Sequence, residues 1–290
     1  MKNNKFYEQA ALLLRIIPIV NRLEEFALKG GTAINFFIRD LPRLSVDIDL
    51  VYLPINNREE SLKKISISLE LIEKNILRLI TGAKCFRKMI GNSLVGLIVN
   101  RDNAIVKVEV NTTIRGTVYQ PVEYLLCKKA IELFEMSVVT KSLVLEELFA
   151  GKICAALDRQ HPRDLYDIKL LFQQEGISEK TRKAFIVYLI SHNRPIVELL
   201  NPNLSDIRSI YEQEFFGMTQ EEVSLEDLLL VRETLITEIK KSLTEDEKKF
   251  LISFKSLQPE WSLLGLPGID ILPAVKWKLY IWVIWINKNI

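Results

Sequence analysis

The sequence has few of the residues that build disulfide scaffolds, zinc sites or membrane spans. Its three cysteines are odd in number and lie far apart, which excludes a disulfide framework and favours a reducing compartment. Its two histidines argue against a histidine-rich zinc site. The longest strongly apolar run, residues 279–286, is shorter than the roughly 20 residues that cross a bilayer. Residues 1–25 carry no export signal, so we expect a cytoplasmic protein without membrane contact.

The composition is that of a globular protein with balanced charge. Apolar residues make up 48% and charged residues 26% of the 290 positions, which is enough for a sizeable core in one large domain or two ordinary ones. Lysine and arginine number 39 against 37 acidic residues, so the chain does not have the excess positive charge of a general nucleic-acid binder. Nucleic-acid binding would need a local basic patch.

The N-terminal part alternates strands and helices. Residues 26–29 are predicted to form a strand that ends in a glycine turn, and Thr32 is the expected N-cap of a helix over 33–38. Residues 45–51 form a second predicted strand, and an amphipathic helix follows over 61–80. Two further strands are predicted at 93–100 and 104–111, joined by a hairpin turn.

Beyond Pro121 the strand patterns fade and helices dominate, beginning with one predicted over 123–133. The segment Gly176-Ile177-Ser178 marks the expected boundary. The sequence therefore predicts an α+β protein: a domain over residues 1–175, with a small mixed sheet flanked by helices, followed by a helical bundle over 176–290.

The second strand carries Asp47 and Asp49. Their spacing places both carboxylates on one face, about 7 Å apart at Cα, where their oxygens can share a cation. Chance alone gives roughly five acid-x-acid pairs in a chain with this many acids, so the setting of the pair decides its meaning. The competing interpretation is a solvated edge strand.

Gly30-Gly31-Thr32 stands directly before the helix that leads into this strand. Glycines let backbone N–H groups approach a phosphate, and a helix N-terminus binds anions through its unpaired amides. An ordinary strand-to-helix turn is the alternative. Together with the carboxylate strand, the turn forms a unit in which an anion cradle precedes a metal-binding strand, as a metal-dependent nucleotidyl transferase requires.

A second cluster of charged residues lies on later helices. Lys152 interrupts the apolar stripe of its helix and therefore needs an anionic partner, which is either a bound triphosphate or a buried carboxylate such as Asp167. Asp164 and Asp167 share a face of the next helix. Arg163 beside Asp164 has the alternative role of an ion pair at the helix start.

Two ordered motifs resemble those of the AbiEii/AbiGii toxin family within the DNA polymerase β-type nucleotidyltransferase superfamily. The motifs are Leu28-Lys29-Gly30-Gly31-Thr32-Ala33 with Arg43-Leu44-Ser45-Val46-Asp47-Ile48-Asp49-Leu50, and Glu146-Glu147-Leu148-Phe149-Ala150-Gly151-Lys152 with Arg159-Gln160-His161-Pro162-Arg163-Asp164-Leu165-Tyr166-Asp167. The resemblance covers residues 26–172. It implies that Lys152 and Asp164 are catalytic, that Arg163 and Asp167 support nucleotide binding together with Lys152, and that the motif residues 146–167 close the triphosphate pocket.

The resemblance also implies a third carboxylate on a neighbouring strand. Glu109 has the required direction by strand alternation, although a surface glutamate between Lys107 and Asn111 is the plain alternative. Asp47, Asp49 and Glu109 are then the expected Mg²⁺ ligands, and Gly30-Gly31-Thr32 is the expected phosphate cradle.

By the same resemblance, the protein is the toxin of a toxin-antitoxin or abortive-infection system. Its expected substrate is GTP or another nucleoside triphosphate, its expected acceptor an RNA such as a tRNA end, and its expected partner a cognate antitoxin. Two alternatives stay open: a small-molecule nucleotidyltransferase of the antibiotic-modifying kind, and a non-catalytic member that binds a nucleotide or a partner.

Overall fold

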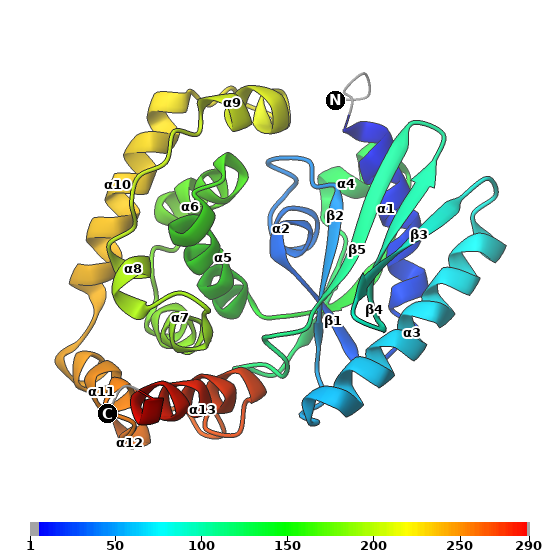
Figure 1. Cartoon of the computed structure of the whole chain (residues 1–290). Helices are drawn as coiled ribbons and strands as arrows, with labels where there is room; N and C mark the ends of the chain where they lie inside the picture. The colour runs from blue at the N-terminus through cyan, green and yellow to red at the C-terminus, as the bar shows by residue number, and fades with distance from the viewer. Residues whose placement is uncertain (1–5, 289–290) are drawn as a thin grey trace. The chain divides into compact units, whose positions relative to one another are not determined.

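The computed structural model describes residues 6–288 and divides into two compact units, each described here by itself. The first unit extends to Val144 and includes residues 217–222, and the second contains 145–216 and the chain from Val223. All strands lie in the first unit and the second is helical (Figure 1). These features confirm the predicted α+β class and the helical C-terminal part. The helices that carry Lys152 and Asp164 belong to the second unit. The assignment of residues 1–175, with these helices, to one functional domain stays a prediction.

The first unit is built on a seven-stranded sheet with the order β3-β4-β5-β2-β1-β7-β6. The pairs β2–β5 and β1–β7 are parallel, and the remaining pairs are antiparallel. The strands are β1 (Phe26–Lys29), β2 (Asp47–Tyr52), β3 (Lys84–Ile90), β4 (Ser93–Arg101), β5 (Ala104–Asn111), β6 (Val122–Leu125) and β7 (Val139–Ser142).

Three of these strands are absent from the sequence-based prediction. The edge strand β3 is mostly exposed, so it lacks the alternation of buried and exposed residues that identifies a strand. The strands β6 and β7 have four residues each, too few for a periodic pattern. The helix predicted over 123–133 is wrong in its first half, because β6 occupies that stretch and α4 spans only Lys128–Phe134.

One face of the sheet is covered by α1 (Tyr7–Val20) and α3 (Arg58–Leu79), as Figure 1 shows. The helix α1 packs against β5, and α3 packs against β4. Buried residues alternate along β5 at Val106, Val108 and Val110, and they form the core under the two helices. Residues between these valines point to the opposite face, which is where the acidic residues lie.

The second unit packs around α7, whose residues 184–190 are buried on every side. Hydroxyl side chains fix the starts of three helices, because Ser178, Ser224 and Thr244 each accept a hydrogen bond from a backbone N–H in the first turn. The helices are α5 (Leu145–Arg159), α6 (Pro162–Gln174), α7 (Glu179–Ser191), α8 (Ile196–Leu200), α9 (Arg208–Ile210), η2 (Tyr211–Phe215), α10 (Leu225–Ser242), α11 (Glu245–Lys255), α12 (Trp261–Leu264) and α13 (Pro273–Lys288). Within residues 6–288, no helix has the length and apolar character of a membrane span.

Candidate active site

Three carboxylates occupy one face of the central strands. Along β2, Asp47 and Asp49 are half-buried while Ile48 between them is buried on the other face. The parallel register pairs Asp49 with Glu109 on β5, and Asp47 with Lys107. Residues opposite each other in neighbouring strands share a face, so the sheet gathers Asp47, Asp49 and Glu109 on the same side. The register therefore puts Glu109 on the face that strand alternation predicted, and its role at the site stays a prediction.

The glycine turn lies directly against this acidic strand. Gly30 has a φ of +74°, and a Cβ placed on it would lie 2.5 Å from Asp49 Oδ2. A Cβ on Gly31 would lie 2.6 Å from the Arg43 guanidinium. Only glycine satisfies both the backbone conformation and the space at position 30, because L-residues rarely adopt this φ and no side chain fits beside the carboxylate.

Thr32 connects the turn to the strand, but it is not the N-cap that the sequence predicted. The first helical turn begins three residues earlier than predicted, as α2 (Gly30–Thr32), with Lys29 at the N-cap, and it continues as the π-helix η1 (Ala33–Ile38). The buried Thr32 hydroxyl is hydrogen-bonded to Ser45 Oγ at 2.9 Å and donates to the main-chain oxygen of Asp47. These bonds hold the helix start and β2 together. Phosphate binding by Gly30, Gly31 and Thr32 stays a prediction.

Glu109 is engaged with a lysine from the sheet edge. Lys88 Nζ donates to Glu109 Oε1 at 2.8 Å. Gly96 lies between them in register, and a Cβ there would lie 2.8 Å from the Val108 carbonyl oxygen and 3.5 Å from Glu109 Cγ, so glycine leaves the space between Lys88 and Glu109 open. Among the described residues, no three histidine, cysteine or acidic side chains are gathered closely enough to hold a metal ion.

The second motif forms a buried charge cluster on α5 and α6. Lys152 Nζ lies 2.8 Å from Asp164 Oδ1 and 3.1 Å from Asp167 Oδ2, and all three side chains are buried. Arg159 adds two hydrogen bonds to Asp164, at 2.6 and 3.1 Å. In this structure Lys152 therefore has two aspartates as anionic partners. The contacts of the cluster join two cations to two anions.

The environment of Asp164 strongly favours its ionised form. Burial by itself would raise the pKa of Asp164, but the charges of Lys152 and Arg159 outweigh it and hold that pKa well below its usual range. The Arg163 guanidinium approaches Glu214 at 3.6 Å. His161 caps α6 by accepting a hydrogen bond from the Arg163 backbone N–H.

Three basic residues of these clusters are missing from the predicted site. Arg43 is a fully buried arginine whose guanidinium lies beside Gly31 and donates to the Leu44 carbonyl oxygen. Lys88 holds Glu109, and Arg159 holds Asp164. Arg159 shares the helical stripe of Lys152 and could have been found by its spacing, whereas Arg43 and Lys88 reach their partners through tertiary structure.

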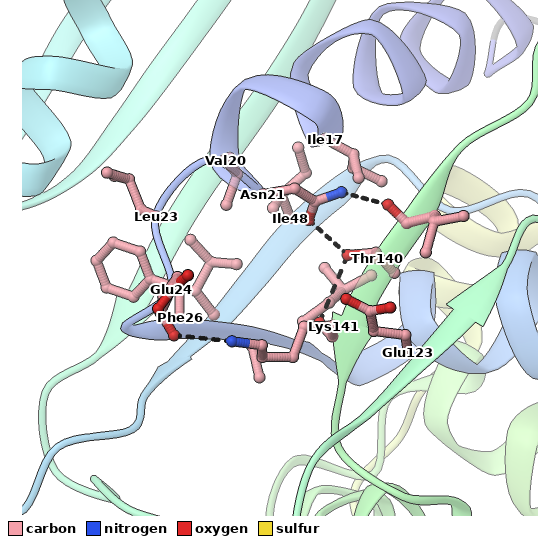
Figure 2. A pocket seen from close by; sticks show the side chains of 14 residues that line it. Ile17, Val20, Asn21, Leu23, Glu24, Phe26, Ile48, Glu123, Thr140 and Lys141 are labelled. Carbon is pink, nitrogen blue, oxygen red and sulfur yellow. Dashed lines mark hydrogen bonds between the residues drawn. The ribbon is translucent and has the colours of Figure 1, made fainter.

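A separate pocket lies on the opposite face of the sheet, between the end of α1 and strands β1 and β7 (Figure 2). Its volume is about 170 Å³, and its lining includes Ile48 and Leu50, which point away from the aspartates. Its polar residues bind one another, since Thr140 donates to Asn21 at 2.8 Å and Lys141 donates to the Glu24 carbonyl oxygen at 3.1 Å. This pocket is therefore distinct from the carboxylate site.

The sequence profile of a family described as "Nucleotidyl transferase AbiEii toxin, Type IV TA system" matches residues 11–279. The chain belongs to the AbiEii family. This family match extends over both units and contains every predicted site residue. No curated protein sequence matches the chain.

A solved structure shares its fold with this AbiEii-family chain. It is similar to MenT4, the nucleotidyltransferase toxin Rv2826c from Mycobacterium tuberculosis H37Rv, with a TM-score of 0.62 and 15% sequence identity. The similarity covers 96% of this chain and 93% of MenT4. At this identity the likeness shows a shared fold. The family and fold together support a nucleotidyltransferase.

Proposed function

We propose that this chain transfers a nucleotidyl group from a nucleoside triphosphate to a hydroxyl group of an acceptor RNA, as the toxin of a type IV toxin-antitoxin system. The observation that carries the proposal is the contact between the glycine turn at Gly30 and the carboxylate of Asp49. A phosphate-binding turn and a pair of carboxylates on one strand are the two parts that nucleotidyl transfer needs next to each other.

Asp47 and Asp49 would hold Mg²⁺, because carboxylate oxygens are the ligands that this ion prefers and both project from one face of β2. Glu109 lies opposite Asp49 and would join them by leaving Lys88. The bound ion would supply positive charge that neutralises the triphosphate and polarises the phosphoryl oxygens. The aspartates are held in place for this role by the bonds between Thr32, Ser45 and the Asp47 main chain.

The glycine turn would bind the phosphates that leave. The backbone N–H groups of Gly30 and Gly31 open a helical turn, a position at which such groups favour an anion. In the reaction a bond forms between the acceptor oxygen and the α-phosphorus, and the bond from that phosphorus to the β-phosphate oxygen breaks. Pyrophosphate leaves, and the hydroxyl proton passes to a carboxylate or to solvent.

The buried cluster of Lys152, Asp164 and Asp167 is proposed to support nucleotide binding, with Arg163. Lys152 Nζ lies beside two aspartates, so a phosphate that binds Lys152 would compete with them for its positive charge. If Lys152 exchanged an aspartate for a phosphate group, the contacts of the cluster would change when the nucleotide binds. Lys152→Met should therefore weaken triphosphate binding while Asp47 and Asp49 keep their metal.

The test is to incubate the protein with each labelled nucleoside triphosphate, Mg²⁺ and total RNA. The proposal expects label in RNA, and the preferred nucleotide identifies the substrate. Label that appears only on an added aminoglycoside would instead support the small-molecule alternative. Absence of transfer, together with no thermal stabilisation by any triphosphate with Mg²⁺, would support a non-catalytic partner-binding protein.

A further inference from the structure

The acidic face of the sheet continues across β5 and β4 to the edge strand β3. The registers align three rows of side chains that share this face. The rows are Asp49–Glu109–Gly96–Lys88, Asp47–Lys107–Ile98–Phe86 and Ile105–Asn100–Lys84. The surface formed by Lys84, Phe86, Lys88, Ile98, Ile105 and Lys107 is called the open sheet face below.

The open sheet face is exposed, although it carries large apolar side chains. Phe86 is 53% exposed and Ile105 is 46% exposed, and Lys84 and Lys107 are also exposed. The opposite face is buried under α1 and α3, with Leu97 and Val108 paired in its core. Phe86, Ile98 and Ile105 share this face, and exposed apolar side chains that lie together mark a binding surface.

The charged residues of the open sheet face are three lysines, Lys84, Lys88 and Lys107. Lys107 lies in the same row as Phe86 and Lys84 lies in the neighbouring row, while Lys88 pairs with Glu109. An aromatic ring surrounded by lysines is the combination that binds single-stranded nucleic acids, in which bases stack on the ring and phosphates meet the cations.

The face leads directly to the aspartates. Phe86 and Asp47 share a row and are separated by three strand spacings, about 14 Å. An RNA strand whose terminal hydroxyl lies at the aspartates would place one of its preceding bases near Phe86. Duplex ends keep their bases stacked inside the helix and would not offer one to the ring.

We propose that the open sheet face binds the acceptor as a single-stranded RNA, with a base stacked on Phe86 and backbone phosphates at Lys84 and Lys107. This inference rests on the proposed function, because it places the acceptor of that reaction. It adds a surface for the acceptor that is separate from the triphosphate-binding residues.

The test measures the binding of a short fluorescein-labelled single-stranded RNA by anisotropy, over a range of salt concentrations. Phe86→Ala should weaken binding about tenfold because it removes one stacking platform, and Phe86→Tyr should restore it. Lys84→Glu should weaken binding and reduce the slope of log affinity against log salt by about 0.7. Lys74→Glu, at an exposed lysine on α3, is the matched charge control and should bind like the wild type.

Equal binding by the wild type, Phe86→Ala and Lys84→Glu would overturn the inference. Equal affinity for duplex RNA or polyglutamate would also overturn it, because general charge attraction would then suffice.

Label transfer to RNA is measured on the same proteins to separate the two proposals. RNA binding that depends on Phe86, without transfer, would contradict the proposed function alone. Label transfer that is unchanged in Phe86→Ala and Lys84→Glu would contradict only the proposal that the open sheet face binds the acceptor.

Discussion

Gly30 and the carboxylate of Asp49 are in direct contact, with 2.5 Å between Asp49 Oδ2 and the position that a Cβ on Gly30 would take. The glycine turn and the strand that carries the aspartates are thus one structural unit. A larger residue at position 30 must displace Asp49 or the turn, because its Cβ and the Asp49 carboxylate would occupy the same space.

Gly30→Ala should reduce nucleotidyl transfer about 100-fold, because a small displacement of a positioned group has an effect of this size. It should also lower the free energy of unfolding by about 1–3 kcal/mol. Gly82→Ala is the matched control: Gly82 has a φ of +79° with no atom within 4 Å of its Cβ position. That variant should lose about 1 kcal/mol of stability and keep full transfer. Equal activity in both variants would show that the Gly30–Asp49 contact is unimportant.

Lys88→Gln should lower the Mg²⁺ concentration at which the protein is half-saturated, because it releases Glu109 from its ion pair. The pair is half-exposed, so the expected change is about two- to fivefold. Thermal stabilisation by Mg²⁺ with a triphosphate gives the measurement. Arg87→Gln, on the same strand but paired with Glu73 instead, should leave the Mg²⁺ dependence unchanged. A higher Mg²⁺ requirement in Lys88→Gln would argue against Glu109 as a ligand.

Asp164→Asn should lower the free energy of unfolding by about 3–5 kcal/mol at neutral pH, because it leaves Lys152 and Arg159 with less compensating charge. The pKa of Asp164 is depressed in the folded protein, so its stabilising contribution is present above the unfolded-state pKa of about 3.9 and is lost as the pH falls below that value. Urea unfolding across this range should show the two proteins converging at low pH. A difference that stays constant down to about pH 2 would contradict an ionised Asp164.

The parts of the fold that were predictable are those in which local pattern and tertiary environment agree. The alternation around Asp47 and Asp49 follows from a strand that is buried on one face only, and the structure has that strand. Val106, Val108 and Val110 predicted β5 for the same reason. The α+β class and the helical C-terminal part followed from these periodicities.

What sequence could not supply is the partner of each side chain. The bond between Lys88 and Glu109 depends on a strand register and on an empty position at Gly96, neither of which leaves a local pattern. Thr32 was wrongly expected at an N-cap because its hydroxyl suits that position equally well. The exposed strand β3 was missed because its charged side chains resemble those of a loop.

The most direct test compares nucleotidyl transfer by the wild type with Asp47→Asn/Asp49→Asn, using labelled triphosphate and RNA. We predict that the double variant folds normally and transfers at least about 100-fold less label, because the charges that hold the metal are removed. Asp102→Asn, at an exposed hairpin-turn position, should transfer like the wild type. Transfer at the wild-type rate by a folded Asp47→Asn/Asp49→Asn protein would contradict the assignment of this strand as the catalytic centre.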